Sequence, residues 1–205
     1  MNKCRNACVV LLVFVLLGCS QINGYVDIAR DRGLSKEYSK ALNKWTRSET
    51  VYSQFETRIH VTATYRSQEF NIAYLKEYER IYPAAVEEKG PPAPAISDPE
   101  GREFILYIYT PEKDSNDFDK QNSIWKIFLI DDRENRIELI DVRRIRKITP
   151  VIESFFPYVN QYYGVTYRIR FPASLQGTET NGDALKKPLR LMITGVLGKL
   201  ELAWN

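Results

Sequence analysis

The sequence predicts a mainly β protein, an antiparallel β-sandwich of about seven strands with two or three short peripheral helices. Apolar and polar residues alternate along 55–65 and 164–171, which is the period of half-buried strands. Helical spacing occurs mainly before residue 103 and strands dominate after it, an order that lacks the rhythm of parallel βαβ units. We expect residues 34–205 to form a single β-sandwich-like domain with helical insertions.

Two amphipathic helices and one strand are expected in the first part of this domain. The first helix begins near Leu34, and the second follows Ser67, a suitable N-cap, and stops before Pro83. Between them, VYSQFETRIHVTATY (51–65) predicts a strand with one wet face. The expected inward positions are Leu34, Tyr38, Leu42 and Trp45 in the first helix, Phe55, Thr57, Ile59, Val61, Ala63 and Tyr65 in the strand, and Phe70, Tyr74, Tyr78 and Ile81 in the second helix.

A proline-rich stretch separates these elements from the remaining strands. The segment GPPAPAISDPEG (90–101) predicts a loop, since its prolines exclude a continuous helix or a central strand. After it, EFILYIY (103–109) has apolar side chains on both faces and predicts a central strand. Thr149 and Pro150 begin a helix of about two turns. Further strands are expected at 123–130 and 136–146, joined by the turn DDREN, and at 164–171, 187–194 and 199–204.

Residues 1–18 have the pattern of a bacterial export signal. Basic residues precede an apolar run at 9–17 that is shorter than the roughly 20 residues a membrane-spanning helix needs. The run ends in LLGC (16–19), which resembles the lipobox of bacterial lipoproteins. This resemblance implies cleavage after Gly18 and acylation of Cys19, with palmitate-like chains that hold the protein to membrane lipid. An ordinary export signal with an incidental Cys19 is the alternative.

The same resemblance implies a location in the cell envelope. The residue after Cys19 is Ser20 and not the aspartate that retains lipoproteins, so in a Gram-negative organism the expected destination is the outer membrane. Residues 19–33 form the lipidated N-terminus and a tether. At about 3.3 Å per residue this tether spans at most roughly 50 Å, which keeps the domain close to its membrane.

Composition excludes several classes of function. The net charge of +3 includes Lys3 and Arg5 of the export signal, so the exported chain is nearly neutral and offers no broad basic field for nucleic acid. The three cysteines, Cys4, Cys8 and Cys19, all lie in or at the end of that signal. The domain therefore has no thiol for a disulfide, a metal or a nucleophile, and we expect its core to provide its stability.

Two polar features of the sequence suggest a functional site, and each also has a simpler explanation as solvated surface. His60, the single histidine, lies on the polar face of its strand, which favours a solvated residue over a zinc or triad site. The loop KDSNDFDK contains oxygen ligands of the kind that calcium prefers, but it lacks the spacing of an EF-hand, which favours a solvated loop. These ligands are Asp114, Asn116, Asp117 and Asp119.

A basic cluster and an aromatic segment are candidates for contacts with partners. The basic residues fit anionic headgroups or acidic partners, although a solvated strand edge explains them more simply. The aromatic segment SFFPYVNQYYG (154–164) is rich in tyrosine, which favours interfaces, and packing over one end of the sandwich is the alternative. The basic cluster is Arg143, Arg144, Arg146 and Lys147, and the possible interface residues are Phe155, Phe156, Tyr158, Tyr162 and Tyr163.

These observations favour a non-enzymatic module. We find no G-x-S-x-G, phosphate-binding or dinucleotide-binding motif, and we assign no catalytic residue, no cofactor and no metal. The expected function is binding or a structural role through protein contacts near the membrane, with an envelope protein as the partner. A carrier of small ligands or glycans on an aromatic surface is the alternative, and a carboxylate-based envelope hydrolase is a third possibility.

Overall fold

The computed structural model describes residues 33–83, 101–172 and 188–204, and it confirms the predicted mainly β fold. The described residues form two antiparallel sheets, one of five strands in the order β1-β2-β3-β7-β6 and one of four in the order β5-β4-β8-β9. The strands of the five-stranded sheet are β1 (Thr46–Ser53), β2 (Glu56–Tyr65), β3 (Gly101–Tyr109), β7 (Val165–Pro172) and β6 (Asp141–Arg144). Those of the four-stranded sheet are β5 (Arg136–Glu138), β4 (Trp125–Ile130), β8 (Leu189–Gly195) and β9 (Gly198–Trp204).

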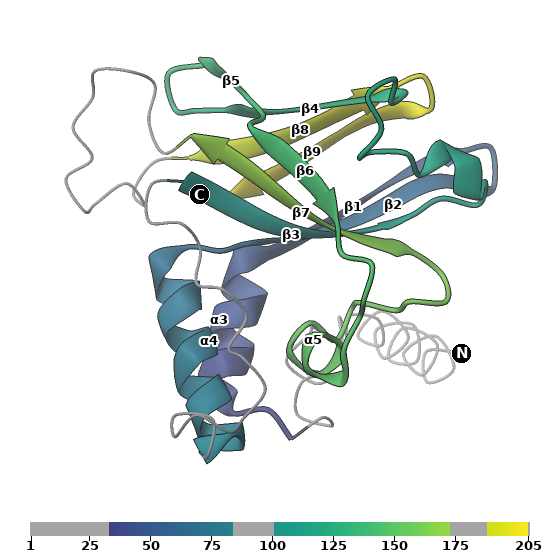
Figure 1. The fold of residues 1–205 in the computed structure, drawn as a ribbon. Coiled ribbons are helices and arrows are strands. Elements are labelled where there is room, and N and C mark those ends of the chain that lie inside the picture. The colour runs from purple at the N-terminus through teal and green to yellow at the C-terminus, as the bar shows by residue number, and fades with distance from the viewer. Residues whose placement is uncertain (1–32, 84–100, 173–187, 205) are drawn as a thin grey trace, which may run out of the picture.

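The five-stranded sheet lies between the four-stranded sheet and the helices α3 (Lys36–Trp45), α4 (Gln68–Ile81) and α5 (Pro150–Phe155) (Figure 1). The two sheets pack face to face, and between them the ring of Phe104 from β3 lies 5.3 Å from the ring of Trp204 from β9. The two sheets meet at one corner, where Arg47 Nε donates to the Ala203 carbonyl at 2.8 Å and Trp204 Nε1 donates to the Trp45 carbonyl at 2.9 Å. We call the opposite side of the five-stranded sheet its helix face.

The segment predicted as one strand over 51–65 is instead a hairpin. Strand β1 begins directly after α3, and the chain turns at Gln54, whose φ of 58° lies in the left-handed region. Within β2, Ile59, Val61 and Ala63 are completely buried, as the alternation predicts. Thr62 and Thr64, on the face predicted to be wet, are buried as well at 1% and 0% exposure, so the prediction of one wet face is wrong for this part of the strand. Phe55, which the alternation placed inside, lies at the turn and is fully exposed, because the turn interrupts the strand on which the pattern depends.

The segment predicted as one strand over 136–146 is divided between the two sheets. The DDREN turn is as expected, with Asp131 Oδ1 accepting from the backbone of Arg133 at 2.9 Å and of Asn135 at 2.8 Å. Strand β5 returns along β4, but the chain then crosses over and β6 pairs with β7. This crossing and the β1–β2 hairpin explain why the described residues contain nine strands instead of about seven.

The predicted helix starts and stripes agree with the structure. The Ser67 hydroxyl accepts from Phe70 N at the start of α4, and Thr149 caps α5 with Pro150 as its first residue. Facing residues of α3, α4 and the segment from α5 onward form an aromatic cluster, in which the Tyr38 hydroxyl donates to the Phe155 carbonyl at 2.8 Å. The cluster comprises Tyr38, Phe70, Tyr74, Tyr78, Phe155 and Phe156, all of which are buried.

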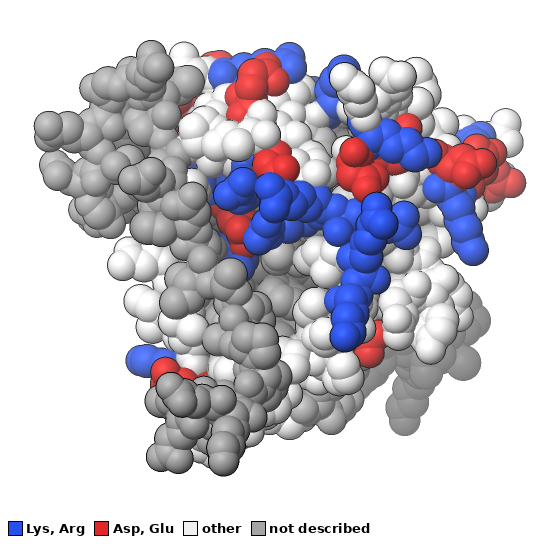
Figure 2. Space-filling view, in the orientation of Figure 1, with Lys and Arg blue, Asp and Glu red and all other residues white. Residues whose placement is uncertain are grey.

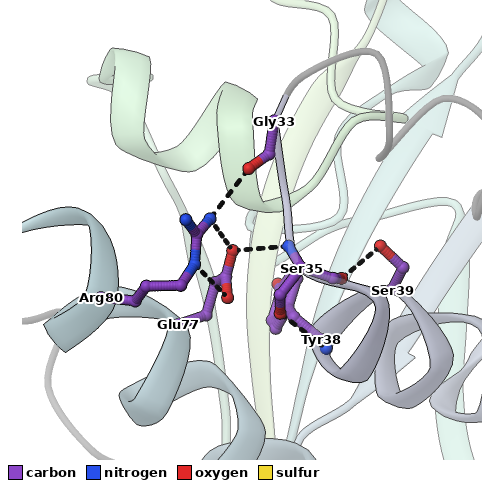
Figure 3. Close-up of polar contacts among 6 residues, drawn as sticks. All are labelled: Gly33, Ser35, Tyr38, Ser39, Glu77 and Arg80. Carbon is purple, nitrogen blue, oxygen red and sulfur yellow. Dashed lines mark hydrogen bonds and ion pairs between the residues drawn. The ribbon is translucent and has the colours of Figure 1, made fainter.

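A polar junction fixes the point at which the N-terminal segment enters the domain (Figure 3). The Glu77 carboxylate, 2% exposed, accepts from Ser35 N at 2.8 Å and from Arg80 at 2.7 Å. Arg80 also donates to the Gly33 carbonyl at 2.8 Å. Burial raises the pKa of Glu77, but the hydrogen bonds from Arg80 and Ser35 outweigh this effect and lower the pKa overall. The start of α3 is therefore held against α4 by a charged carboxylate.

Three predicted features lie outside the described residues. They are the export signal with Cys19, the tether up to residue 32, and the proline-rich loop up to residue 100.

Candidate binding surface

A shallow hollow of about 400 Å³ opens on the helix face of the five-stranded sheet, on the part of β1, β2 and β3 that the helices do not cover. Its floor consists of side chains from β1, β2 and β3, and a loop residue contributes one wall. Tyr52 and Tyr163, at its rim, are 66% and 69% exposed. We call it the tyrosine hollow and define it by Thr50, Tyr52, Thr57, His60, Tyr107, Tyr109 and Tyr163.

Strand register brings these side chains together. Thr50 pairs with His60, and His60 pairs with Tyr109, so one row crosses three strands. Since alternate residues of a strand face the same side, Tyr107 lies beside Tyr109 in the floor. The register of β1 and β2 shifts between Val51 and Tyr52, close to the hairpin turn. Tyr52, which follows this shift in register, lies at the rim of the hollow.

Hydroxyl groups fix the imidazole of His60. Its Nδ1 is 2.7 Å from the Thr50 hydroxyl, and its Nε2 is 3.1 Å from the Thr62 hydroxyl. A hydroxyl both donates and accepts, so these partners satisfy either neutral tautomer. Burial lowers the pKa of His60, and the nearby charge of Glu49 raises it by a smaller amount. His60 is thus a half-buried, neutral part of the floor at pH 7, only partly solvated where its polar strand face predicts a solvated residue.

The loop before β7 brings Tyr163 to the rim. Asn160 organises this loop, because its carbonyl accepts from Gly164 N at 3.2 Å and its side chain accepts from Tyr162 N at 3.0 Å. Gly164 packs so closely on β3 that an added Cβ would lie 2.5 Å from the ring of Tyr107. A larger residue at Gly164 would push the loop, and Tyr163 with it, away from the floor.

The structure divides the predicted interface residues into two groups. Phe155 and Phe156 are buried in the aromatic cluster at 0% and 6% exposure. Tyr158 is half-buried, and its hydroxyl is 2.7 Å from that of Thr64. Tyr162 and Tyr163 are exposed, and of the five only Tyr163 lines the hollow.

The acidic loop uses two of its proposed calcium ligands for internal hydrogen bonds. The Asn116 side-chain amide donates to the Ile108 carbonyl at 2.9 Å, and its oxygen accepts from the Tyr167 hydroxyl at 3.0 Å. Asp117 accepts from the Ser123 hydroxyl at 2.9 Å. Asp114 and Asp119 are exposed. Within residues 33–83, 101–172 and 188–204, no group of three or more His, Cys, Asp or Glu side chains has a geometry that could hold a metal.

The basic cluster lies on and after β6, the edge strand of the five-stranded sheet. All four of its side chains are exposed, as expected for a strand edge and the segment that follows it.

The buried acids are spread over three separate places. In the part of the chain that the structure describes, they are Glu77, Glu103 and Asp117. Glu77 belongs to the junction at α3, Glu103 forms an ion pair with Arg66 at 2.7 Å, and Asp117 belongs to the loop after β3. None of the residues that define the tyrosine hollow is acidic.

Comparisons with known proteins return no relative. The chain matches no protein-family model, and it matches neither a curated protein nor a solved structure. No described helix is both long and apolar enough to cross a membrane.

Sequence reasoning identified only His60 and Tyr163 as candidate functional residues of the hollow, and it predicted that Thr57 points inward with Ile59. Thr50 lies on the part of β1 that the sequence pattern did not identify as a strand, and Tyr52 lies near the start of the predicted strand 51–65, where the hairpin turn was not foreseen. Tyr107 and Tyr109 lie in a strand with apolar residues on both faces. That pattern does not reveal which part of the strand is left uncovered by other elements. The spacing of Tyr107 and Tyr109 was the one available signal, since it places two tyrosines on one side of a strand.

Proposed function

We propose that this protein is a lipid-anchored, non-enzymatic binding module of a bacterial cell envelope, and that it contacts a partner protein through the tyrosine hollow. The export signal and the lipobox at Cys19 support the anchor. The observation that carries the binding role is the pair of exposed rings of Tyr52 and Tyr163 above a floor of hydroxyl groups.

The shape and chemistry of the hollow favour a protein partner. Small-molecule sites enclose most of the ligand surface, whereas this hollow is shallow and open. Tyrosine is enriched among the residues that dominate the energy of protein interfaces, because its ring buries a large area and its hydroxyl keeps a polar contact. The hydroxyls of Thr50 and Thr62 hold His60 in place, which pre-organises the floor before a partner arrives.

The anchor is tested with Cys19→Ala. We expect the wild-type protein, expressed in a bacterial host, to carry an acyl-sized mass and to fractionate with membranes, and the variant to lose both properties. A wild-type protein that is soluble and unacylated would contradict the anchor and indicate a secreted protein.

The binding role is tested with two neighbouring tyrosines. Tyr163→Ala removes a residue of the hollow, and Tyr162→Ala removes an exposed ring that does not line it. Crosslinking in whole cells, followed by capture of the full-length tagged protein, should recover a reproducible envelope protein with the wild type and with Tyr162→Ala. Recovery should fall at least about tenfold with Tyr163→Ala, as for a residue worth more than about 1.4 kcal/mol of binding. Equal recovery with both variants would place the interface elsewhere.

A glycan ligand is the second candidate, since tyrosine rings beside threonine hydroxyls also suit a sugar, with its apolar ring faces and polar edges. Titration of the protein with soluble peptidoglycan fragments tests this function. Saturable binding that Tyr109→Ala abolishes, without loss of folding, would favour the glycan over the protein partner.

A further inference from the structure

A second surface lies on the same helix face, where β3, β7 and β6 run side by side. Strand register produces two neighbouring rows of side chains. The first row is Glu103, Arg170 and Asp141, in which charges alternate. The second row is Ile105, Arg168 and Arg143, in which two arginines face each other directly across the strand pair.

Among the residues that the structure describes, arginines outnumber acidic side chains on this surface. Glu103 is shared by Arg66 at 2.7 Å and Arg168 at 4.0 Å. Asp141 is shared by Arg143 at 2.8 Å and Arg170 at 3.5 Å. In the described part of the chain, four guanidinium groups therefore share two carboxylates. We call these four residues, the largely buried Arg66 and the more exposed Arg143, Arg168 and Arg170, the arginine surface.

The second row is unfavourable for the isolated protein. Like charges directly opposite each other on neighbouring strands destabilise a sheet. Arg143 and Arg168 remain accessible, with side chains 62% and 31% exposed, so an incoming group can reach both. Figure 2 shows Lys and Arg side chains gathered on this side of the molecule, over β6 and the segment that leads to α5. Arg146 and Lys147, both exposed, belong to that segment.

We propose that Arg143 and Arg168 bind a phosphate-bearing group. The fork of a guanidinium matches two oxygens of a phosphate, and two forks on adjacent strands supply enough donors for one such group. Asp141 holds Arg143 from the side at 2.8 Å, and Glu103 lies 4.0 Å from Arg168. The excess positive charge of the described arginines compensates the anion. A bound phosphate would also relieve the repulsion between the facing arginines. The group belongs either to a lipid head or to a small free phosphate, and the chemistry of recognition is the same for both.

The test uses the double variant Arg143→Gln/Arg168→Gln. Arg170 still pairs with Asp141 and Arg66 still pairs with Glu103 in this variant, so neither carboxylate loses all its partners. Lys126→Gln, on the exposed side of β4 in the other sheet, is a control that removes one positive charge away from the arginine surface. All proteins are full-length and carry Cys19→Ala, so that acylation does not mask weaker binding. In the absence of phosphate, the double variant should unfold at the same temperature as its parent or at a higher one.

Two measurements distinguish the sources of the phosphate. The first is flotation with vesicles of phosphatidylcholine alone or mixed with phosphatidylglycerol, in which the phosphatidylcholine fraction corrects for binding through the apolar leader. The second is the rise in unfolding temperature with inorganic phosphate, compared with chloride at equal ionic strength. If the group is a lipid head, the double variant should lose about tenfold or more of its binding to anionic vesicles, as expected for two basic residues at a membrane surface, while Lys126→Gln retains it.

If the group is a small free phosphate, inorganic phosphate should stabilise the parent and Lys126→Gln but not the double variant, and vesicle binding should be equal in all three. Either pattern supports the phosphate site. Equal behaviour of the double variant and Lys126→Gln in both measurements would overturn it. Neither result depends on the tyrosine hollow, so the site and the proposed partner binding can fail separately.

Discussion

Two rows of residues on the helix face of the five-stranded sheet have similar chemistry but different surroundings. Thr46, Thr64 and Ile105 form the row nearer the helices, and they are 5%, 0% and 6% exposed. Thr50, His60 and Tyr109 form the row in the tyrosine hollow, and all three are half-exposed. Both rows contain a side-chain hydrogen bond between β1 and β2, of 2.7 Å in each case. The difference is the cover that α3, α4 and the segment after α5 provide, so the same strands support a closed core at one end and an open surface at the other.

The largest expected effect comes from the aromatic segment that contributes to both regions. Phe155→Ala should reduce the free energy of unfolding by about 3–5 kcal/mol, because it leaves a cavity at the centre of the aromatic cluster. Tyr162→Ala, in the exposed part of the same segment, should change it by less than about 0.5 kcal/mol. Urea denaturation measures both values. Similar losses in the two variants would mean that the open loop is as important to stability as the core.

A matched pair of threonines compares the two rows directly. Thr64→Val removes the buried hydrogen-bond partner of the Thr46 hydroxyl and should cost about 1–3 kcal/mol of unfolding free energy. Thr50→Val removes a hydrogen bond that water can replace, and should cost less than about 1 kcal/mol. Chemical denaturation of both variants under the same conditions provides the comparison. A cost for Thr50→Val as large as that for Thr64→Val would show that the hollow is closed in solution.

Most of the elements of the fold could be predicted because their signals are local. Ser67 and the Thr149–Pro150 pair mark helix starts by their own hydrogen bonds and backbone angles, and alternation identifies β7 without knowledge of its neighbours. The crossing between β5 and β6 was missed because it depends on which sheet offers a free edge, and that is a tertiary property.

The tyrosine hollow could not be predicted for a similar reason. Its residues come from three strands and a loop that span 50–163, and they are brought together by strand register and by the loop before β7. Ser and Thr at alternate positions of β1 and β2 do not reveal which hydroxyls a helix will cover. The arginine surface shows the same limit. The sequence indicated Arg143, but its partner across the strand pair, Arg168, lies 25 positions further along the chain.

Substitution of Glu77 tests how α3 and α4 are held together over the covered end of the five-stranded sheet. Glu77→Gln keeps the shape of the side chain but removes the charge that binds Arg80 and Ser35 N, and should cost about 1–3 kcal/mol at neutral pH. The pKa of Glu77 is lowered in the folded protein, so its contribution is complete above the unfolded pKa near 4.5 and is lost as the pH falls through the folded value. The difference between wild type and variant, measured by urea denaturation, should therefore shrink below about pH 4.5. A difference independent of pH would mean that the carboxylate is not charged in the fold.

His60 gives the smallest expected effect and reports on the open row. Burial lowers its pKa in the folded protein, so the folded state binds a proton less readily than the unfolded chain. The contribution of neutral His60 to stability is thus complete above the unfolded pKa of 6.5 and is lost as the pH falls through the folded value. The titration of Glu77 lies at lower pH, so measurements between about pH 5 and pH 8 separate the two groups.

We expect the unfolding temperature of the wild type to fall over that interval and that of His60→Gln to fall less, because glutamine keeps hydrogen-bonding capacity toward Thr50 and Thr62 without a titrating group. Differential scanning calorimetry at closely spaced pH values measures this difference. If the two proteins lose stability in parallel, His60 titrates as it does in the unfolded chain. The open row is then more exposed to water than the structure indicates. If the wild type alone loses stability, the hydroxyls of the open row hold a neutral imidazole, and the hollow presents a partner with a fixed, uncharged floor at neutral pH.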